Sequence, residues 1–238
     1  MAWQCILGIV IMVVSFIGVL ITAKMRMEPM AILCAIVMLV GLGLYGWYYF
    51  NPPPNLDYQV YGKAVAAKMG ATVKAAGVSK AVWVTGDASS EYAKSCYDAF
   101  KTAFGGDAES LSVMAGDMGM MELNPAKLRE LLKGRSADEA VVLDVSMMMD
   151  PSKIEFIKSS YKGAKIFLTN NANMMGVSAK VLEKALNKGS LVAMVTGLDN
   201  IDAEFTPDED DLEEAFSKRY VIVTKDNFAE HKAKFGMM

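Results

Sequence analysis

Eight polar residues are well placed for chemistry because they follow predicted buried strands. They are Asp87, Ser89, Ser90, Ser146, Asn170, Asn171, Asp199 and Asn200. In an open parallel sheet, ligands bind at the carboxyl ends of the strands, so these carboxylates, hydroxyls and amides are candidate ligand-binding residues. The same residue types also cap helices and form turns, and that second interpretation stays open for each of them.

A hydrolase is one alternative raised by the first of these loops. Gly86-Asp87-Ala88-Ser89 is similar to the Gly-Asp-Ser opening of the SGNH hydrolases, and His231 is the only histidine that could act as general base. The serine comes one position late, and Asp226 precedes His231 by five residues where an Asp-x-x-His pair is expected. We therefore predict no catalytic residue, and the sequence favours a protein that is not an enzyme.

Cofactor and metal motifs are missing from the sequence. The loop after the first predicted strand has neither Gly-x-Gly-x-x-Gly nor a Lys-Ser/Thr phosphate loop, which argues against nucleotides. Nine acidic residues lie between Asp199 and Glu214, but their spacing is not that of an EF-hand loop. We predict no cofactor and no metal, and we interpret the acidic run as a solvated helix start, with Thr206 as N-cap and Pro207 in the first turn.

Methionines cluster in an unusual way after three predicted strands. Eight of the nineteen lie there: Met118, Met120, Met121, Met147, Met148, Met149, Met174 and Met175. Loops that follow parallel strands share one edge of the sheet, so these thioethers form a candidate partner surface. Copper(I) binding and a generally methionine-rich composition are the alternatives.

The N-terminal fifth of the chain is strongly apolar. The whole sequence of 238 residues is 53% hydrophobic and 21% charged, with a mean hydropathy of +0.25. Two uncharged runs, at about 2–23 and 29–50, have the length of transmembrane helices and are joined by a short loop. We predict a transmembrane hairpin over 1–50, a Pro-rich linker over 51–56 and a separate domain over 57–238.

The basic residues around the hairpin indicate its orientation. Lys24 and Arg26 lie in the short loop, and basic loops stay in the cytoplasm. The sequence therefore predicts a protein of the bacterial inner membrane with two spans and with its C-terminal domain on the exterior, periplasmic side. The net charge of −3 shows no polybasic character, which argues against nucleic acid as a partner.

The C-terminal part alternates short β-branched runs with amphipathic helical patterns. Strands are predicted at 81–85, 111–115, 140–145, 165–169, 191–196 and 220–224, with helices at 59–75, 92–104, 128–132, 154–161, 181–186, 212–216 and 227–235. Strands separated by crossover helices pair in parallel and need cover on both faces. The predicted fold class is α/β: a doubly wound, mainly parallel, Rossmann-like three-layer domain of about six strands.

Part of this domain resembles a known fold. Residues 80–92, the helix that follows them, and the segment Asp138-Glu-Ala-Val-Val-Leu-Asp144 resemble one lobe of the type I periplasmic binding proteins. The resemblance covers about 90 residues, and it implies a domain that recognises a small solute. Those proteins close two lobes over a ligand, whereas about 180 residues here provide a single lobe.

The main functional prediction from the sequence is a membrane-anchored, non-catalytic interaction or assembly module, such as a subunit of a bacterial envelope complex. Its expected partners are the lipid bilayer and a protein partner or a second copy of the chain. The alternative is a one-lobed sensor domain that binds a small molecule and is related to the periplasmic binding proteins. An SGNH-like hydrolase ranks third.

Overall fold

The computed structural model describes residues 3–24, 28–50, 57–113, 125–145, 147–148, 154–170, 172, 174–175, 177–202 and 204–235. The chain forms two compact units, Met1–Asp57 and Tyr58–Met238. The predicted linker at 51–56 lies outside the described residues.

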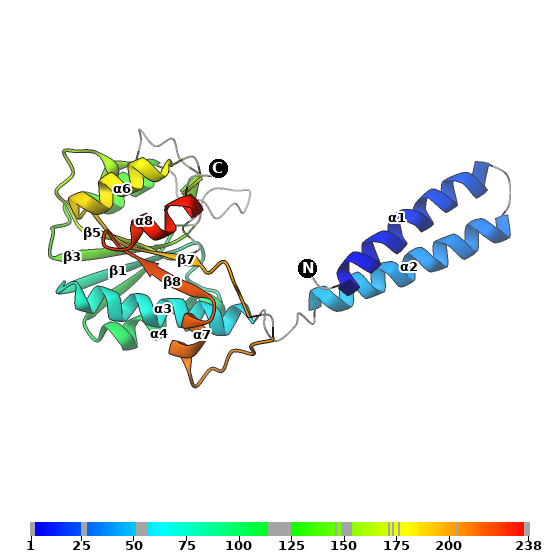
Figure 1. Cartoon of the computed structure of the whole chain (residues 1–238), viewed down its shortest axis with the longest axis horizontal. Coiled ribbons are helices and arrows are strands. Elements are labelled where there is room, and N and C mark those ends of the chain that lie inside the picture. The colour runs from blue at the N-terminus through cyan, green and yellow to red at the C-terminus, as the bar shows by residue number, and fades with distance from the viewer. Residues whose placement is uncertain are drawn as a thin grey trace. The chain divides into compact units, whose positions relative to one another are not determined.

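The first unit is a hairpin of two helices, α1 (Trp3–Lys24) and α2 (Glu28–Phe50), which run side by side in Figure 1. The two helices approach closely where their side chains are small. A Cβ added to Gly18 would lie 2.9 Å from the Cys34 sulfur, and Ser15 is buried. The Thr22 hydroxyl donates to the Gly18 carbonyl oxygen at 2.8 Å, so this polar side chain is satisfied within its own helix.

The hairpin corrects the prediction of two membrane spans. A span needs an unbroken apolar stretch of about 20 residues. Among the helical residues described here, no helix combines the length and the apolar character that crossing a membrane requires. The predicted two-span location in the inner membrane is therefore wrong.

The second unit is built on a six-stranded sheet in the order β2-β1-β3-β5-β7-β8. Its strands are β1 (Lys80–Thr85), β2 (Asp107–Ser112), β3 (Glu139–Asp144), β5 (Lys165–Leu168), β7 (Leu191–Gly197) and β8 (Tyr220–Val223). The first five pair in parallel and β8 pairs antiparallel to β7. The predicted mainly parallel α/β sheet of about six strands is confirmed. The strand order reverses between β1 and β3, because β2 and β3 lie on opposite sides of β1.

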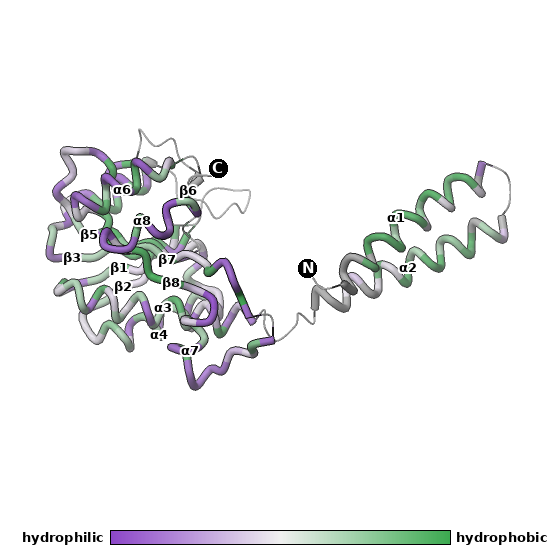
Figure 2. The backbone as a smooth tube through the Cα atoms, in the orientation of Figure 1, coloured by the Kyte–Doolittle hydropathy of each residue, from purple (hydrophilic) through white to green (hydrophobic). Residues whose placement is uncertain are grey.

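Helices cover both faces of this sheet (Figure 1). α3 (Tyr58–Ala75), α4 (Glu91–Phe104) and α7 (Leu212–Ser217) lie on one face. α5 (Pro125–Leu132), the 3₁₀ helix η3 (Glu155–Ile157), α6 (Ala179–Lys188) and α8 (Phe228–His231) lie on the other. Successive side chains of β3 alternate between the two cores, with Val142 under α3 and α4 and Val141 and Leu143 opposite. This burial on both faces explains why the strands are continuously apolar, as Figure 2 shows for the centre of the unit.

Three predicted elements differ from those observed. β2 begins four residues before the predicted strand, because it pairs with β1 from Lys80 and Asp107 onward. The helix expected over 154–161 is reduced to η3. The helix expected to start after Thr206 begins at Leu212, where the Asp211 carboxylate accepts from the Glu214 N–H at 2.9 Å. The acidic run is thus partly a turn before a short helix, and Lys63 and Lys68 of α3 form ion pairs with Glu209 and Glu213.

Candidate functional site

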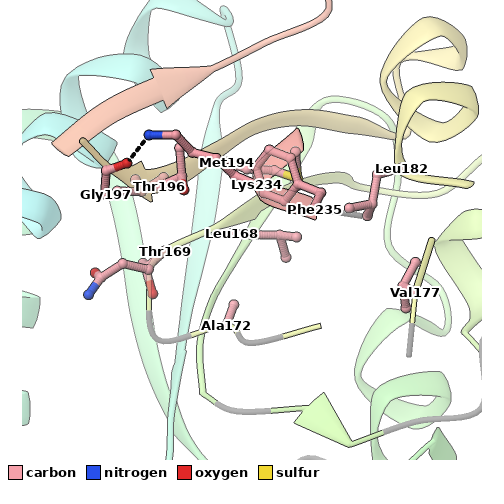
Figure 3. Close-up of a pocket in the computed structure, with 12 residues that line it drawn as sticks. Leu168, Thr169, Ala172, Val177, Leu182, Met194, Thr196, Gly197, Lys234 and Phe235 are labelled. Atoms are coloured by element: carbon pink, nitrogen blue, oxygen red, sulfur yellow. Dashed lines mark hydrogen bonds between the residues drawn. The ribbon is translucent and has the colours of Figure 1, made fainter. Parts of the chain in front are cut away.

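A cavity of about 300 Å³ opens at the carboxyl ends of β5 and β7 (Figure 3). Thr169 and Asn170 follow β5, Thr196 and Gly197 end β7, and Lys234 and Phe235 belong to the 3₁₀ helix η4 (Lys232–Phe235). The remaining lining residues are Leu168, Ala172, Val177, Leu182, Met194 and Val195. A concave, mainly apolar site with a few converging polar groups is the usual form of a small-molecule site.

Lys234 ties the C-terminal segment to the end of β7. Its Nζ donates to the Gly197 carbonyl oxygen at 2.5 Å and lies 3.1 Å from the Asp199 carboxylate. The Lys234 side chain is 16% exposed, whereas that of Asp199 is 83% exposed. The Lys234 ammonium group is therefore largely buried against the end of β7, while the Asp199 carboxylate that pairs with it is exposed to solvent.

Other contacts hold the same C-terminal segment in place. Phe235 stacks on the buried Phe228 with ring centroids 5.7 Å apart, and Lys232 forms a 2.7 Å ion pair with Glu183 of α6. The turn before α8 is fixed by Asn227, whose side-chain oxygen accepts from the Thr224 N–H at 2.8 Å. The segment therefore forms one wall of the cavity, and it is held in place by the stacked pair Phe228–Phe235 and by the ion pair of Lys232 with α6.

A buried polar pair lies behind the cavity, at the ends of β3 and β5. The Thr169 hydroxyl donates to the Asp144 carboxylate at 2.6 Å, and both residues are buried. The buried Cys96 of α4 lies within the electrostatic influence of Asp144. Burial and, to a smaller extent, the negative charge of Asp144 together raise the pKa of the Cys96 thiol to about 12. The thiol is consequently protonated and unreactive at neutral pH.

The loop after β1 contains three of the predicted site residues, and it closes on itself. The Asp87 carboxylate accepts from the Ser89 N–H at 2.8 Å and from the Ser89 hydroxyl at 2.6 Å. These bonds hold the pKa of Asp87 below its ordinary value, the hydroxyl bond having the larger effect. Ser90 is the N-cap of α4 and accepts from the Ala93 N–H at 3.1 Å. In this loop, the predicted site residues form a turn and a helix cap.

Three of the remaining predicted polar residues, Asn170, Asp199 and Asn200, follow β5 or β7. Asn170 lines the cavity. Asp199 does not line it but forms an ion pair with the lining residue Lys234. Asn200 is exposed. Ser146 and Asn171 lie outside the described residues. His231 is half-buried at the end of α8, while the Ser89 hydroxyl points its proton at Asp87.

Two of the three methionine clusters meet in a small parallel ladder. β4 (Met147–Met148) pairs with β6 (Met174–Met175), so Met147 faces Met174 and Met148 faces Met175 along the backbone. Met118, Met120, Met121 and Met149 lie outside the described residues. The methionine partner surface stays a prediction.

Sequence analysis missed the residues that complete the cavity. Thr169 and Thr196 ended predicted strands, which was the available signal for their position. Lys234 and Phe235 gave no such signal, because a terminal helix becomes a cavity wall only when it folds back against the sheet. Asp144 looked like the end of an apolar run, and its pairing with Thr169 depends on β3 and β5 being neighbours.

Comparisons with known proteins concern the fold. No family description and no curated protein matches the sequence. A carbohydrate transporter from Acidothermus cellulolyticus, in complex with myo-inositol, is 13% identical at a TM-score of 0.46, covering 73% of this chain and 60% of that one. A sugar ABC transporter from Actinomyces odontolyticus is 15% identical at a TM-score of 0.41, and the match covers 71% of this chain and 63% of that one. A sugar-binding protein of a Bacillus halodurans ABC transporter is 11% identical at a TM-score of 0.39, and the match covers 73% of this chain and 63% of that one.

The chain spans less than two thirds of each of these structures. The predicted resemblance to one lobe of the type I periplasmic binding-protein fold is confirmed at the level of the fold. The main functional prediction, a membrane-anchored interaction or assembly module, is wrong. The described helices include none that is long and apolar enough to cross a membrane, so the anchor on which that prediction depended is missing from this part of the chain.

Proposed function

We propose that the α/β unit binds a small solute in the cavity at the carboxyl ends of β5 and β7. The observation that carries this proposal is the cavity itself, which combines apolar walls with polar groups at one edge of a parallel sheet. Its volume of about 300 Å³ suits a small molecule.

In such sheets, ligands usually bind at the point where the strand order reverses, which here lies between β1 and β3. The cavity lies two strands away from that point. At the reversal point, the polar side chains of the loop after β1 form a turn and a helix cap. At the ends of β5 and β7, polar and apolar side chains together line a cavity. We therefore propose that the ligand binds at the ends of β5 and β7 and not at the reversal point.

Filling the cavity tests the proposal directly. Ala172 lines it and is buried, so Ala172→Phe places a ring in the space that the ligand needs. Ala233→Phe is the matched control, because Ala233 is exposed on the segment that forms the wall. Binding is measured on the full chain by ¹³C-methyl NMR, using isobutyrate, isobutanol and isobutylamine as probes.

The expected result is that at least one probe shifts the methyl resonances of Met194 and Leu182, with a dissociation constant on the order of 1 mM. Ala172→Phe should abolish these shifts and Ala233→Phe should retain them. The methyl of Met69, buried under the opposite face, should not respond. Binding that survives Ala172→Phe would place the ligand elsewhere and overturn the proposal.

A further inference from the structure

The cavity has two chemically different ends. Figure 3 shows Thr196, Gly197 and Thr169 at one end, and Val177 and Leu182 at the other. The polar end includes the ammonium group of Lys234, whose aliphatic stem runs along the cavity beside Phe235. A ligand that fills this space therefore needs a polar head at the strand ends and an apolar body under Phe235.

The hydrogen-bonding groups at the polar end determine which head fits. A lysine ammonium has three protons. Lys234 directs two interactions, to the Gly197 carbonyl and to Asp199, and these use at most two of the three. The Thr196 hydroxyl, half-buried at the end of β7, is a second donor beside it. Two donors, one of them charged, match the two oxygens of a carboxylate.

The acidic groups nearby do not cancel this preference. Asp199 lies in solvent, where its repulsion of a bound anion is weakened by water and salt. Asp144 is absent from the described lining of the cavity, and its carboxylate accepts a hydrogen bond from the Thr169 hydroxyl. Among the described residues that line the cavity, Lys234 alone is basic.

We infer that the ligand is a small carboxylate with a short, branched apolar body, whose carboxyl group is bound by the Lys234 ammonium and the Thr196 hydroxyl. This inference rests on the proposed function and names the ligand class for the same cavity. Leu168, Leu182 and Met194 contact the body, and Phe235 covers it.

Three probes with the same isopropyl body separate the contribution of the head group from that of the body. Isobutyrate, isobutanol and isobutylamine share one branched apolar body and differ in charge. In methyl NMR titrations of the full chain, isobutyrate should bind about 10-fold more tightly than isobutanol, because a charged hydrogen bond adds about 1.5 kcal/mol. Isobutylamine should bind more weakly still, because its charge repels that of Lys234.

Variants at the ion pair should shift the isobutyrate affinity in opposite directions. Lys234→Gln keeps a donor for the Gly197 carbonyl but loses the charge, so isobutyrate should bind about 10-fold more weakly while isobutanol is unaffected. Asp199→Asn removes the competing carboxylate, so isobutyrate should bind several-fold more tightly. Lys234→Arg keeps the charge and should retain the preference.

The outcomes distinguish the two proposals. If isobutylamine binds as tightly as isobutyrate, or if Lys234→Gln leaves isobutyrate binding unchanged, the carboxylate inference is wrong and the binding site remains. If none of the three probes shifts the Met194 and Leu182 methyls, the proposed function fails together with the inference.

Discussion

The loop after β1 and the ends of β5 and β7 lie at the same edge of one sheet and carry similar residue types, yet they are built differently. After β1, Asp87 and Ser89 bond to each other and Ser90 caps α4 within three residues. At the end of β7, the Gly197 carbonyl is met by Lys234 from a segment 37 residues further on. The first loop satisfies its polar groups locally, and the second relies on a distant segment.

This difference indicates where ligand sites form in such sheets. A loop that leads directly into a helix must satisfy the free N–H groups of that helix, and its Ser and Asp side chains are consumed in doing so. β7 leads into the long connection 198–211, and no helix begins among the described residues of that connection, so the end of β7 keeps unfilled space against α6 and η4. Three predictions test this contrast.

Removing the aromatic anchor of the C-terminal segment should have the largest effect. Phe228→Ala deletes a buried ring that stacks on Phe235, and we expect a loss of about 3 to 5 kcal/mol in the free energy of unfolding. Because Phe235 covers the cavity, isobutyrate binding should also be lost at temperatures where the variant is folded. Chemical denaturation and methyl NMR measure the two effects.

Phe100→Ala is the matched control for this prediction. Phe100 is equally buried on the opposite face, where it packs against Trp83 with centroids 5.0 Å apart. Its loss should destabilise the unit by a similar amount and leave the affinity of the folded fraction unchanged. Equal losses of affinity in the two variants would show that the cavity responds only to overall stability.

Removing the helix cap should have an intermediate effect that is confined to stability. Ser90→Ala leaves the Ala93 N–H at the start of α4 without its side-chain acceptor, at a cost of about 1 kcal/mol. Ser95→Ala, which removes a hydroxyl that donates to the Tyr92 carbonyl within the same helix and caps no helix end, should cost less than about 0.5 kcal/mol. Isobutyrate binding measured by methyl NMR should be unchanged in both variants. A loss of binding in Ser90→Ala would indicate that the loop after β1 takes part in ligand binding.

The smallest effect concerns the titration of Asp87. The Ser89 hydroxyl lowers the pKa of Asp87 below 3.8, so this group stabilises the fold above about pH 3.8, and the contribution is lost as the pH falls through the folded-state pKa. Ser89→Ala should raise the pKa of Asp87 toward 3.8 in an NMR titration. The pKa of Asp138, which is lowered by Ser136 at the opposite edge of the sheet, should stay low in this variant.

The sequence predicted the central strands well because those strands are buried on both faces. The runs that became β3, β5 and β7 are continuously apolar, which is typical of a covered parallel sheet. β2 was placed four residues late because its sequence, Asp-Ala-Glu-Ser-Leu-Ser, alternates between exposed and half-buried positions at the edge of the sheet. The 154–161 pattern failed because buried Ile154 and Phe156 fit a short 3₁₀ turn as well as a helix.

The cavity was predicted only in part. The rule that ligands bind at the carboxyl ends of strands selected Asn170, which lines the cavity, and Asp199, which forms an ion pair with the lining residue Lys234. The same rule selected Asp87 and Ser89, because a residue's type does not reveal whether its loop bonds to itself. Lys234 could not be found without knowing that residues 232–235 return to β7, which depends on tertiary packing.

The ladder between β4 and β6 joins the loop that follows β3 to the loop that follows β5. Its two paired positions link the chain just beyond Asp144 to the chain between Ala172 and Val177, two residues of the cavity wall. The described residues of these two loops, Met147–Met148 and Met174–Met175, are therefore coupled, since neither pair can move outward without breaking the ladder. Their backbone amides should exchange with solvent as a single cooperative group, and a molecule entering beside Ala172 would strain or relax the end of β3 as well.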